Sequence, residues 1–414
     1  MPTLGLVYAS SVNPMRDIPG AWRRVAAGAG LIGSDGIVRP TIFAEMSALA
    51  AETGAVNLGQ GFPDEDGPAE VLETARAAIA NGVNQYPPGR GIQDLRAAIA
   101  EHQQRFYGLH LDPGRNVLVT AGATEAIAAT LLALVESPDD EIVVFEPYYD
   151  SYAAVVALSG ARLVTVPLRW PDFQPDLDRL RDAVTDRTRA ILVNDPHNPT
   201  GAVFTDEVRS LIVELAERSD AVIVTDEVYE HLAFDEPHVP LSTLPGAWDR
   251  TVSISSGGKT FSTTGWKIGW ATGPADLIDA VLAIKQWLTY VNGAPFQPAI
   301  ATGLRLPDAY FAGMAQTLRG KRDLLGAGLR TAGFSVSVPS GSYFTVADAA
   351  PLGAGDAADF CRALPHTAGV VAIPLTAFVT PEHRAQYATL VRFAACKRVD
   401  VLEDAASRLA SLGG

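Results

Sequence analysis

Lys259 and the small polar residues around it form the part of this sequence best suited to chemistry. The lysine lies in a stretch rich in glycine, serine and threonine that follows the β-branched run Thr251–Ile254. Such a run is typical of a buried strand, so we expect Lys259 in a loop at the strand's end, where α/β enzymes hold their functional groups. Burial there would favour the neutral amine, which can attack an aldehyde. A lysine in a surface turn is the structural alternative.

The same stretch also carries groups that bind phosphate. Its glycines let the backbone approach an anion closely, Ser256 and Ser262 can donate hydrogen bonds to phosphate oxygens, and Lys267 adds a positive charge. An imine-forming amine beside a phosphate site is what pyridoxal 5′-phosphate requires, so we predict this cofactor. No metal site is predicted, since Cys361 and Cys396 do not lie in a metal-binding spacing.

Further polar groups follow other predicted strands. Gly122-Ala123-Thr124 opens a predicted helix, whose N-terminal amides can bind an anion. Asn194 and Asn198 lie in a proline-rich turn at the end of another strand. Asp226 ends the next one, where a carboxylate could keep a pyridine nitrogen protonated and so make the ring a better electron sink. Helix N-capping is the alternative for such an aspartate.

These motifs resemble those of class I aminotransferases of fold type I. The segment Gly258-Lys259-Thr260-Phe261-Ser262, continued by Thr264-Gly265-Trp266-Lys267-Ile268-Gly269-Trp270, is most similar to the kynurenine and glutamine transaminase branch. The loop Asn57-Leu58-Gly59-Gln60-Gly61-Phe62-Pro63-Asp64 and the turn Asn194–Gly201 resemble segments of the same enzymes. The resemblance runs from Phe43 to Leu409. It implies a pyridoxal-phosphate enzyme that transfers an amino group from an amino acid to a 2-oxo acid.

The resemblance also implies a role for each matching residue. Lys259 would hold the cofactor and move the substrate proton. Asp226 would contact the pyridine nitrogen of the cofactor, and Tyr229, the third catalytic residue, would form a hydrogen bond with its phenolic oxygen. The implied cofactor-binding residues are Gly122, Ala123, Thr124, Tyr149, Asn194, Asn198, Asp226, Tyr229, Ser256, Lys259 and Lys267, with Tyr86 reaching across a dimer interface. The implied substrate-binding residues are Phe43, Gly61, Asn198, Tyr290 and Arg392, whose guanidinium would grip the α-carboxylate. The structural alternatives are core packing for Tyr149, a surface turn for Tyr86 and an exposed strand position for Arg392.

Longer segments bear on the substrate. Residues 43–50, 122–128 and 290–298 resemble actinobacterial members assigned to N-succinyl-diaminopimelate aminotransfer in lysine synthesis, with 2-oxoglutarate as the expected acceptor. Thr124 departs from the aromatic residue common in the kynurenine branch, which leaves specificity open. The further carboxylates of a succinylated substrate need extra cations, for which Arg24, Arg90 and Lys285 are candidates.

A broad-specificity kynurenine, glutamine or methionine aminotransferase and a cysteine-S-conjugate β-lyase remain alternatives. A transcription regulator of this fold would need a fused DNA-binding domain, for which residues 1–38 are too short.

Composition limits the other possibilities. The 414-residue chain has a net charge of −15, which argues against nucleic acid or an anionic membrane as its main partner. Two cysteines do not make a disulfide framework, and no apolar run approaches the roughly 18 to 20 residues that span a bilayer. We therefore expect a cytoplasmic protein, and the resemblance implies that it is a homodimer.

The elements that position these groups form a regular alternation of strands and helices. Seven strand-like runs are predicted at 117–120, 141–145, 162–167, 190–194, 221–225, 251–255 and 268–272, which indicates an α/β protein with a mainly parallel seven-stranded sheet. Long helices are predicted from Ala275 to about Tyr290 and from Tyr310 to Ala332. Short strands and a final helix then indicate a smaller α+β domain. The expected division is a flexible extension at 1–38, a segment at 39–65 packing on the small domain, a large cofactor-binding domain at 66–305 and a small domain at 306–414.

Overall fold

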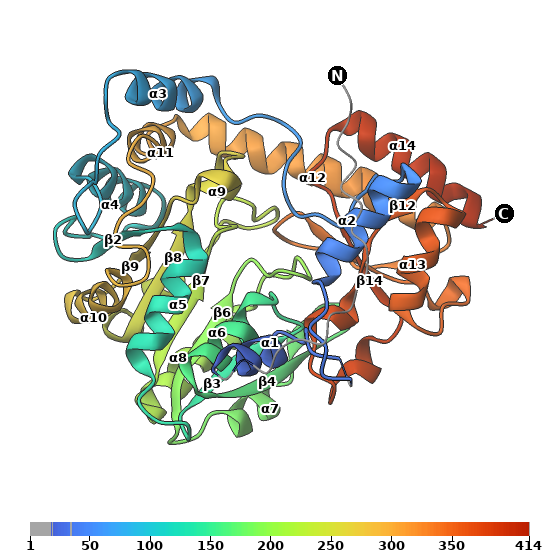
Figure 1. Ribbon diagram of the computed structural model, residues 1–414, viewed down its shortest axis with the longest axis horizontal. Coiled ribbons are helices and arrows are strands. Elements are labelled where there is room, and N and C mark those ends of the chain that lie inside the picture. Colours follow the sequence, from blue (N-terminus) through green and yellow to red (C-terminus); the bar gives the residue numbers. More distant parts are fainter. Residues whose placement is uncertain (1–17, 19, 34, 414) are drawn as a thin grey trace.

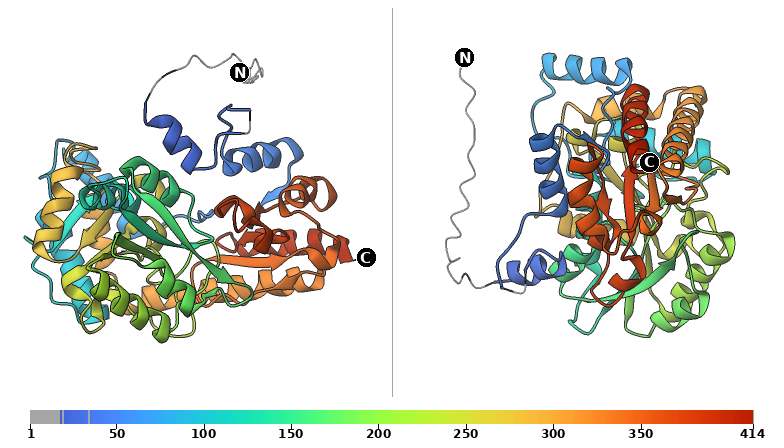
Figure 2. Two further views of the ribbon diagram at one scale, coloured as in Figure 1. Left: turned by 90° about the horizontal axis from the view of Figure 1, so that it is seen from below. Right: turned by 90° about the vertical axis from the view of Figure 1, so that its right-hand side faces the viewer.

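The computed structural model describes residues 18, 20–33 and 35–413 (Figure 1). Two sheets organise this part of the chain, one of eight strands and one of four, and they lie side by side in the views of Figure 2. The extension predicted at 1–38 lies partly outside the described residues, at 1–17, 19 and 34. Its described part contains α1 (Trp22–Gly28), which packs against α6 (Ser151–Ser159).

The large sheet has the order β2-β9-β8-β7-β6-β3-β4-β5. Its strands are β2 (Val117–Thr120), β3 (Glu141–Glu146), β4 (Arg162–Arg169), β5 (Gln174–Pro175), β6 (Thr188–Asn194), β7 (Val222–Asp226), β8 (Thr251–Ser256) and β9 (Gly269–Thr272). Strands β4, β3, β6, β7 and β8 are parallel, β9 runs antiparallel to both of its neighbours, and β5 folds back on β4. The seven predicted strands are therefore present, and the two-residue β5 adds an eighth at one edge.

Helices cover both faces of this sheet, which explains its apolar strands. Alternate residues along a strand point to opposite faces, so Ile142 and Val144 pack with α5 (Gly122–Leu134), α6 and α10 (Ala275–Lys285). Val143 and Phe145 pack on the other face with α7 (Leu177–Ala183) and α8 (Asp206–Ser219). Because the helices exclude water from both faces of the sheet, polar side chains can gather only at the strand ends. No helix in the described residues is both long and apolar enough to cross a bilayer.

The smaller sheet has the order β10-β11-β14-β13, with all neighbours antiparallel. Its strands are β10 (Ser335–Val336), β11 (Phe344–Asp348), β13 (Ile373–Pro374) and β14 (Leu390–Ala394). A separate parallel pair joins β1 (Val56–Asn57) to β12 (Val370–Val371), which brings the early chain onto this region. The remaining helices are α2 (Ile42–Thr53), α3 (Ala69–Ala80), α4 (Gln93–Tyr107), α9 (Gly257–Thr260), α11 (Gln297–Leu304), α12 (Asp308–Thr331), α13 (Ala357–Thr367) and α14 (Val399–Leu409).

The helix predicted from Ala275 to about Tyr290 is too long. It ends at Lys285, whose Nζ donates to the carbonyl of Tyr290 at 2.7 Å and to that of Gly89 at 3.1 Å. These bonds fold the chain back on itself, and Tyr290 adopts a positive φ of 64°. Helix α11 was not predicted, whereas α12 lies within two residues of the bounds expected at Tyr310 and Ala332.

Candidate active site

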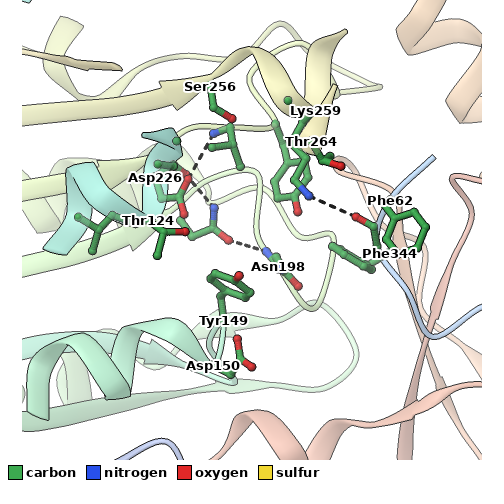
Figure 3. A pocket seen from close by; sticks show the side chains of 18 of the residues that line it. Phe62, Thr124, Tyr149, Asp150, Asn198, Asp226, Ser256, Lys259, Thr264 and Phe344 are labelled. Carbon is green, nitrogen blue, oxygen red and sulfur yellow. Dashed lines mark hydrogen bonds between the residues drawn. The ribbon is translucent and has the colours of Figure 1, made fainter. Parts of the chain in front are cut away.

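A cavity of about 290 Å³ lies at the carboxyl ends of β6, β7 and β8, between the two sheets (Figure 3). Residues from distant parts of the chain line it because parallel strands end at the same edge of their sheet. Of the predicted site residues, those that line it are Phe43, Gly61, Gly122, Ala123, Thr124, Tyr149, Asn194, Asn198, Asp226, Tyr229, Ser256, Lys259, Lys267 and Arg392. The structure thus brings fourteen of the sixteen predicted residues together.

Lys259 enters the cavity from α9, the single helical turn that follows β8. Its Nζ donates to the carbonyl of Gly61 at 3.2 Å and lies 5.9 Å from the ring centre of Tyr229. Burial lowers the pKa of Lys259 to about 8, so a substantial fraction of its amine is neutral near neutral pH. Gly61 cannot be replaced there, because a Cβ would lie 2.6 Å from the Phe344 ring.

Asp226 is the last residue of β7 and is 5% exposed. The hydroxyl of Tyr152 donates to its Oδ2 at 2.6 Å, and the Val228 amide lies 3.4 Å from its Oδ1. Burial raises the pKa of Asp226 to about 6, while the Tyr152 hydrogen bond works against that rise. The carboxylate is therefore ionised at neutral pH and can hold a cationic partner in the cavity.

A chain of hydrogen bonds links Asp226 to Arg392. The Asn194 amide donates to the Asp226 carbonyl at 2.7 Å, and its Oδ1 accepts from the backbone of Asn198 at 2.6 Å. Arg392 then donates to Asn198 Oδ1 at 3.1 Å. Because Asn198 Oδ1 is occupied, its side-chain NH₂ group remains as a donor for a bound molecule.

Arg392 lies on β14 in the smaller sheet and is 1% exposed. It also donates to the Gly59 carbonyl at 2.7 Å, and its guanidinium lies 4.2, 4.8 and 5.4 Å from the ring centres of Phe344, Phe378 and Phe43. Its Nε has no hydrogen-bond partner, and no carboxylate among the described residues forms an ion pair with it. A buried cation without a counterion is suited to a carboxylate ligand.

A second cationic region lies at the start of α5. Gly122 has a φ of 76° there, and a Cβ in its place would lie 3.2 Å from Lys267 Nζ. Within the described part of the chain, Lys267 has no ion-pair partner. Ser256 lines the same part of the cavity from the end of β8 (Figure 3). The helix N-terminus, the lysine and the hydroxyl are groups that can bind an anion.

Two predicted site residues do not line the cavity. Tyr290, expected to bind the substrate, is 52% exposed because the turn after α10 carries it to the surface, and it does not line the cavity of a single chain. Tyr86 is 81% exposed, and its ring centre lies 5.6 Å from that of Tyr290.

The three candidate cations for further carboxylates also lie outside the cavity. Arg24 donates to the Ala157 carbonyl on α6 at 2.7 Å. Arg90 forms an ion pair with Asp279 on α10, and Lys285 is bound to two backbone carbonyls. None of them is available to a molecule in the cavity of its own chain.

Sequence reasoning missed several residues in the cavity or directly next to it. Tyr152, which binds Asp226, lies one helical turn after Tyr149, and that spacing could have indicated it. Tyr343, whose hydroxyl donates to the Gly61 carbonyl at 2.5 Å, lies in the segment Gly341–Phe344. Asp150 lines the cavity but carried no signal in its local sequence, whereas Thr264, which also lines the cavity, lies in the segment that contains Lys259.

Comparison with known proteins gives the family. The profile of the aminotransferase class I and II family matches residues 53–408. A Mycobacterium tuberculosis protein named as a probable N-succinyldiaminopimelate aminotransferase is 55% identical over 90% of this chain and 96% of its own length. The solved structure of N-succinyldiaminopimelate aminotransferase from that organism aligns with a TM-score of 0.87 and 55% identity, over 90% of this chain and 97% of that one. Escherichia coli methionine aminotransferase is 37% identical over 90% of this chain and 96% of its own length. The chain belongs to the aminotransferase class I and II family.

Proposed function

We propose that this aminotransferase uses pyridoxal 5′-phosphate to move the amino group of an N-succinyl-diaminopimelate to 2-oxoglutarate. The observation that carries the proposal is the cavity that joins a lysine amine, a buried carboxylate and an unpaired buried arginine: Lys259, Asp226 and Arg392. The choice of substrate is supported by the 55% identity to the Mycobacterium tuberculosis protein, against 37% to the methionine enzyme.

The residues present fit the cofactor. The α5 N-terminus, Ser256 and Lys267 would hold its phosphate, and the absence of a Cβ at Gly122 keeps Lys267 close to that helix. Tyr149 would stack on the ring, Asp226 would accept a hydrogen bond from the ring nitrogen, and the remaining contacts would come from Asn194, Asn198 and Tyr229. When bound, the cofactor supplies an aldehyde that captures amines and a cationic ring that withdraws electrons from the bonds at Cα.

The chain's own residues would then bind and orient the substrate and move its proton. Arg392 would receive the α-carboxylate through two parallel hydrogen bonds, which its aromatic neighbours and its bonds to Asn198 and Gly59 hold in place. The neutral amine of Lys259 would take the proton from Cα and return it to the carbon of the cofactor's aldehyde group, since burial lowers the pKa of Lys259 and so favours its neutral form. Gly61 and Phe344 would exclude water from this side.

We also infer that the chain acts as a homodimer. Large apolar side chains are exposed together near Tyr86 and Tyr290, namely Ile79, Val83, Trp287 and Leu288, and Trp287 is 82% exposed. A second copy would cover this surface and bring Tyr86 to the partner's phosphate site. The cations that the cavity lacks for further substrate carboxylates would then have to come from the second chain.

The substrate is tested by comparing kcat/KM for N-succinyl-L,L-diaminopimelate with the values for methionine, glutamine, phenylalanine and kynurenine, each with 2-oxoglutarate. We expect the highest value for the succinylated substrate. A higher value for another amino acid would indicate the broad-specificity function favoured by the 35% identity to mouse kynurenine–oxoglutarate transaminase 3, over 88% of this chain and 86% of that protein. Pyruvate and ammonia released from a cysteine conjugate without an acceptor would indicate a β-lyase.

A further inference from the structure

Five polar residues lie buried directly behind the cavity, and we call them the His238 cluster: Asp195, Glu227, Glu230, His238 and Ser255. Each is at most 6% exposed, and none of them lines the cavity. Buried ionisable groups are costly unless they are paired, so such a group needs an explanation.

The cluster is built from the same strand ends as the site. Consecutive side chains of a strand point to opposite sides, so each strand end sends one residue into the cavity and its neighbour behind it. The pairs are Asn194 with Asp195 after β6, Asp226 with Glu227 after β7, and Ser256 with Ser255 at the end of β8. A displacement in the cluster would therefore reach the cavity through a single peptide unit.

His238 is the positive group of this cluster. Its Nε2 lies 3.5 Å from Glu227 Oε2. Burial by itself lowers the pKa of His238, but the carboxylates of Glu227, Asp195 and Glu230 together raise it. The neighbouring carboxylates thus favour the imidazolium form of His238, which would balance the charge of Glu227, although neither ring nitrogen has a hydrogen-bond partner among the described residues.

The other acidic groups around His238 have partners of their own, of which only the one of Asp195 is a cation. Arg209 Nε lies 3.0 Å from Asp195 Oδ2, and Ser255 donates to Glu230. Burial, with a contribution from Glu227, raises the pKa of Glu230 to about 7. The remaining titratable groups that face the cluster are Tyr107, whose ring centre lies 5.8 Å from that of His238, and the uncharged His231. Glu227 has only His238 as its counterion among the described residues, and its Oε1 has no hydrogen-bond partner.

We propose that His238 is a positioning residue that neutralises Glu227 and thereby sets the charge and orientation of Asp226 toward the cofactor ring. Burial raises the pKa of Asp226, and the Glu227 carboxylate adds to that rise. Without His238, the charge of Glu227 would be uncompensated one residue away from Asp226. The inference rests on the proposed function, because Asp226 matters in this way only if it faces the ring nitrogen of the cofactor.

The test uses the full chain loaded with pyridoxal 5′-phosphate and four variants: His238→Gln, Glu227→Gln, the double variant, and the exposed His366→Gln on α13 as a control. Among the four variants, only His238→Gln leaves the buried Glu227 carboxylate without its counterion. At about pH 8 we expect His238→Gln to lower kcat by at least about tenfold with KM within about threefold. The pH midpoint of the cofactor absorbance should rise by about half a pH unit or more, because the added negative charge favours the protonated form.

Glu227→Gln, the double variant and His366→Gln should all keep kcat within about threefold of the parent, and the double variant should restore the absorbance midpoint. If the contact between His238 and Glu227 were only structural, both single variants would lower kcat by the same factor. Equal losses in the two single variants, a parent-like His238→Gln, or a double variant no better than His238→Gln would each overturn the inference. If His238→Gln does not fold, recovery of folding and kcat in the double variant still decides the matter. Failure of the parent to bind the cofactor or transfer amino groups would refute the proposed function instead.

Discussion

Replacing Arg392 by lysine tests how the substrate carboxylate is bound. The guanidinium donates to Asn198 Oδ1 at 3.1 Å and to the Gly59 carbonyl at 2.7 Å, and its remaining N–H groups can form two parallel hydrogen bonds with a carboxylate. A lysine keeps the charge but has a single nitrogen. It cannot bind the carboxylate twice and also hold both fixed partners.

The size of the effect follows from these bonds. One hydrogen bond to a charged group contributes about 1.5–3 kcal/mol, and a buried carbonyl left without its donor costs about 1–3 kcal/mol. Their combined loss is about 2.5 kcal/mol at the lower end, which corresponds to a fall close to a hundredfold in kcat/KM. Folding should be preserved, because the positive charge stays over the ring of Phe344.

The assay follows the first half-reaction by the change in cofactor absorbance, with an amino acid and with the corresponding amine that lacks the carboxylate. We expect the hundredfold loss for the amino acid alone, and a nearly unchanged rate for the amine. Arg181→Lys is the matched control, since Arg181 is exposed on α7 and forms an ion pair with Asp178. A loss below about threefold with the amino acid, or an equal loss with the amine, would refute the assigned role of Arg392.

Four further outcomes are expected. Lys259→Ala should abolish both aminotransfer and borohydride trapping of the cofactor, and trapping on another lysine would contradict its role. In the cofactor-free parent, imine formation should speed up as pH rises toward about 8, because only the neutral Lys259 amine attacks; a rate independent of pH between 6 and 9 would argue against this. Tyr152→Phe removes the hydrogen bond that opposes the burial-driven rise in the pKa of Asp226 to about 6, so the acid limb of the kcat/KM profile should move to higher pH. Light scattering should show a dimer, and Tyr86→Ala should release the cofactor faster; an active monomer with tightly bound cofactor would exclude the shared site.

Much of the fold was predictable because its signals are local. Apolar β-branched runs separated by helical patterns indicate a sheet buried on both faces, and the observed strands match the predicted ones to within about two residues. The missed features depend on contacts between distant segments. Helix α10 ends where Lys285 binds carbonyls of two other turns, and the sequence around Lys285 contains no glycine or proline stop signal until Gly293.

The sequence by itself predicted the chemistry proposed for the cavity, since the types of Lys259, Asp226 and Lys267 and their places near strand ends favour a phosphorylated aldehyde as the ligand. Only the tertiary structure decided which groups are charged and paired. The neighbours of Arg392 come from four separate segments, and the bond from Tyr152 to Asp226 spans 74 residues. The exposure of Tyr290 and the buried pair behind Asp226 were decided in the same way, because pairing and burial depend on where distant segments meet rather than on the local residue pattern.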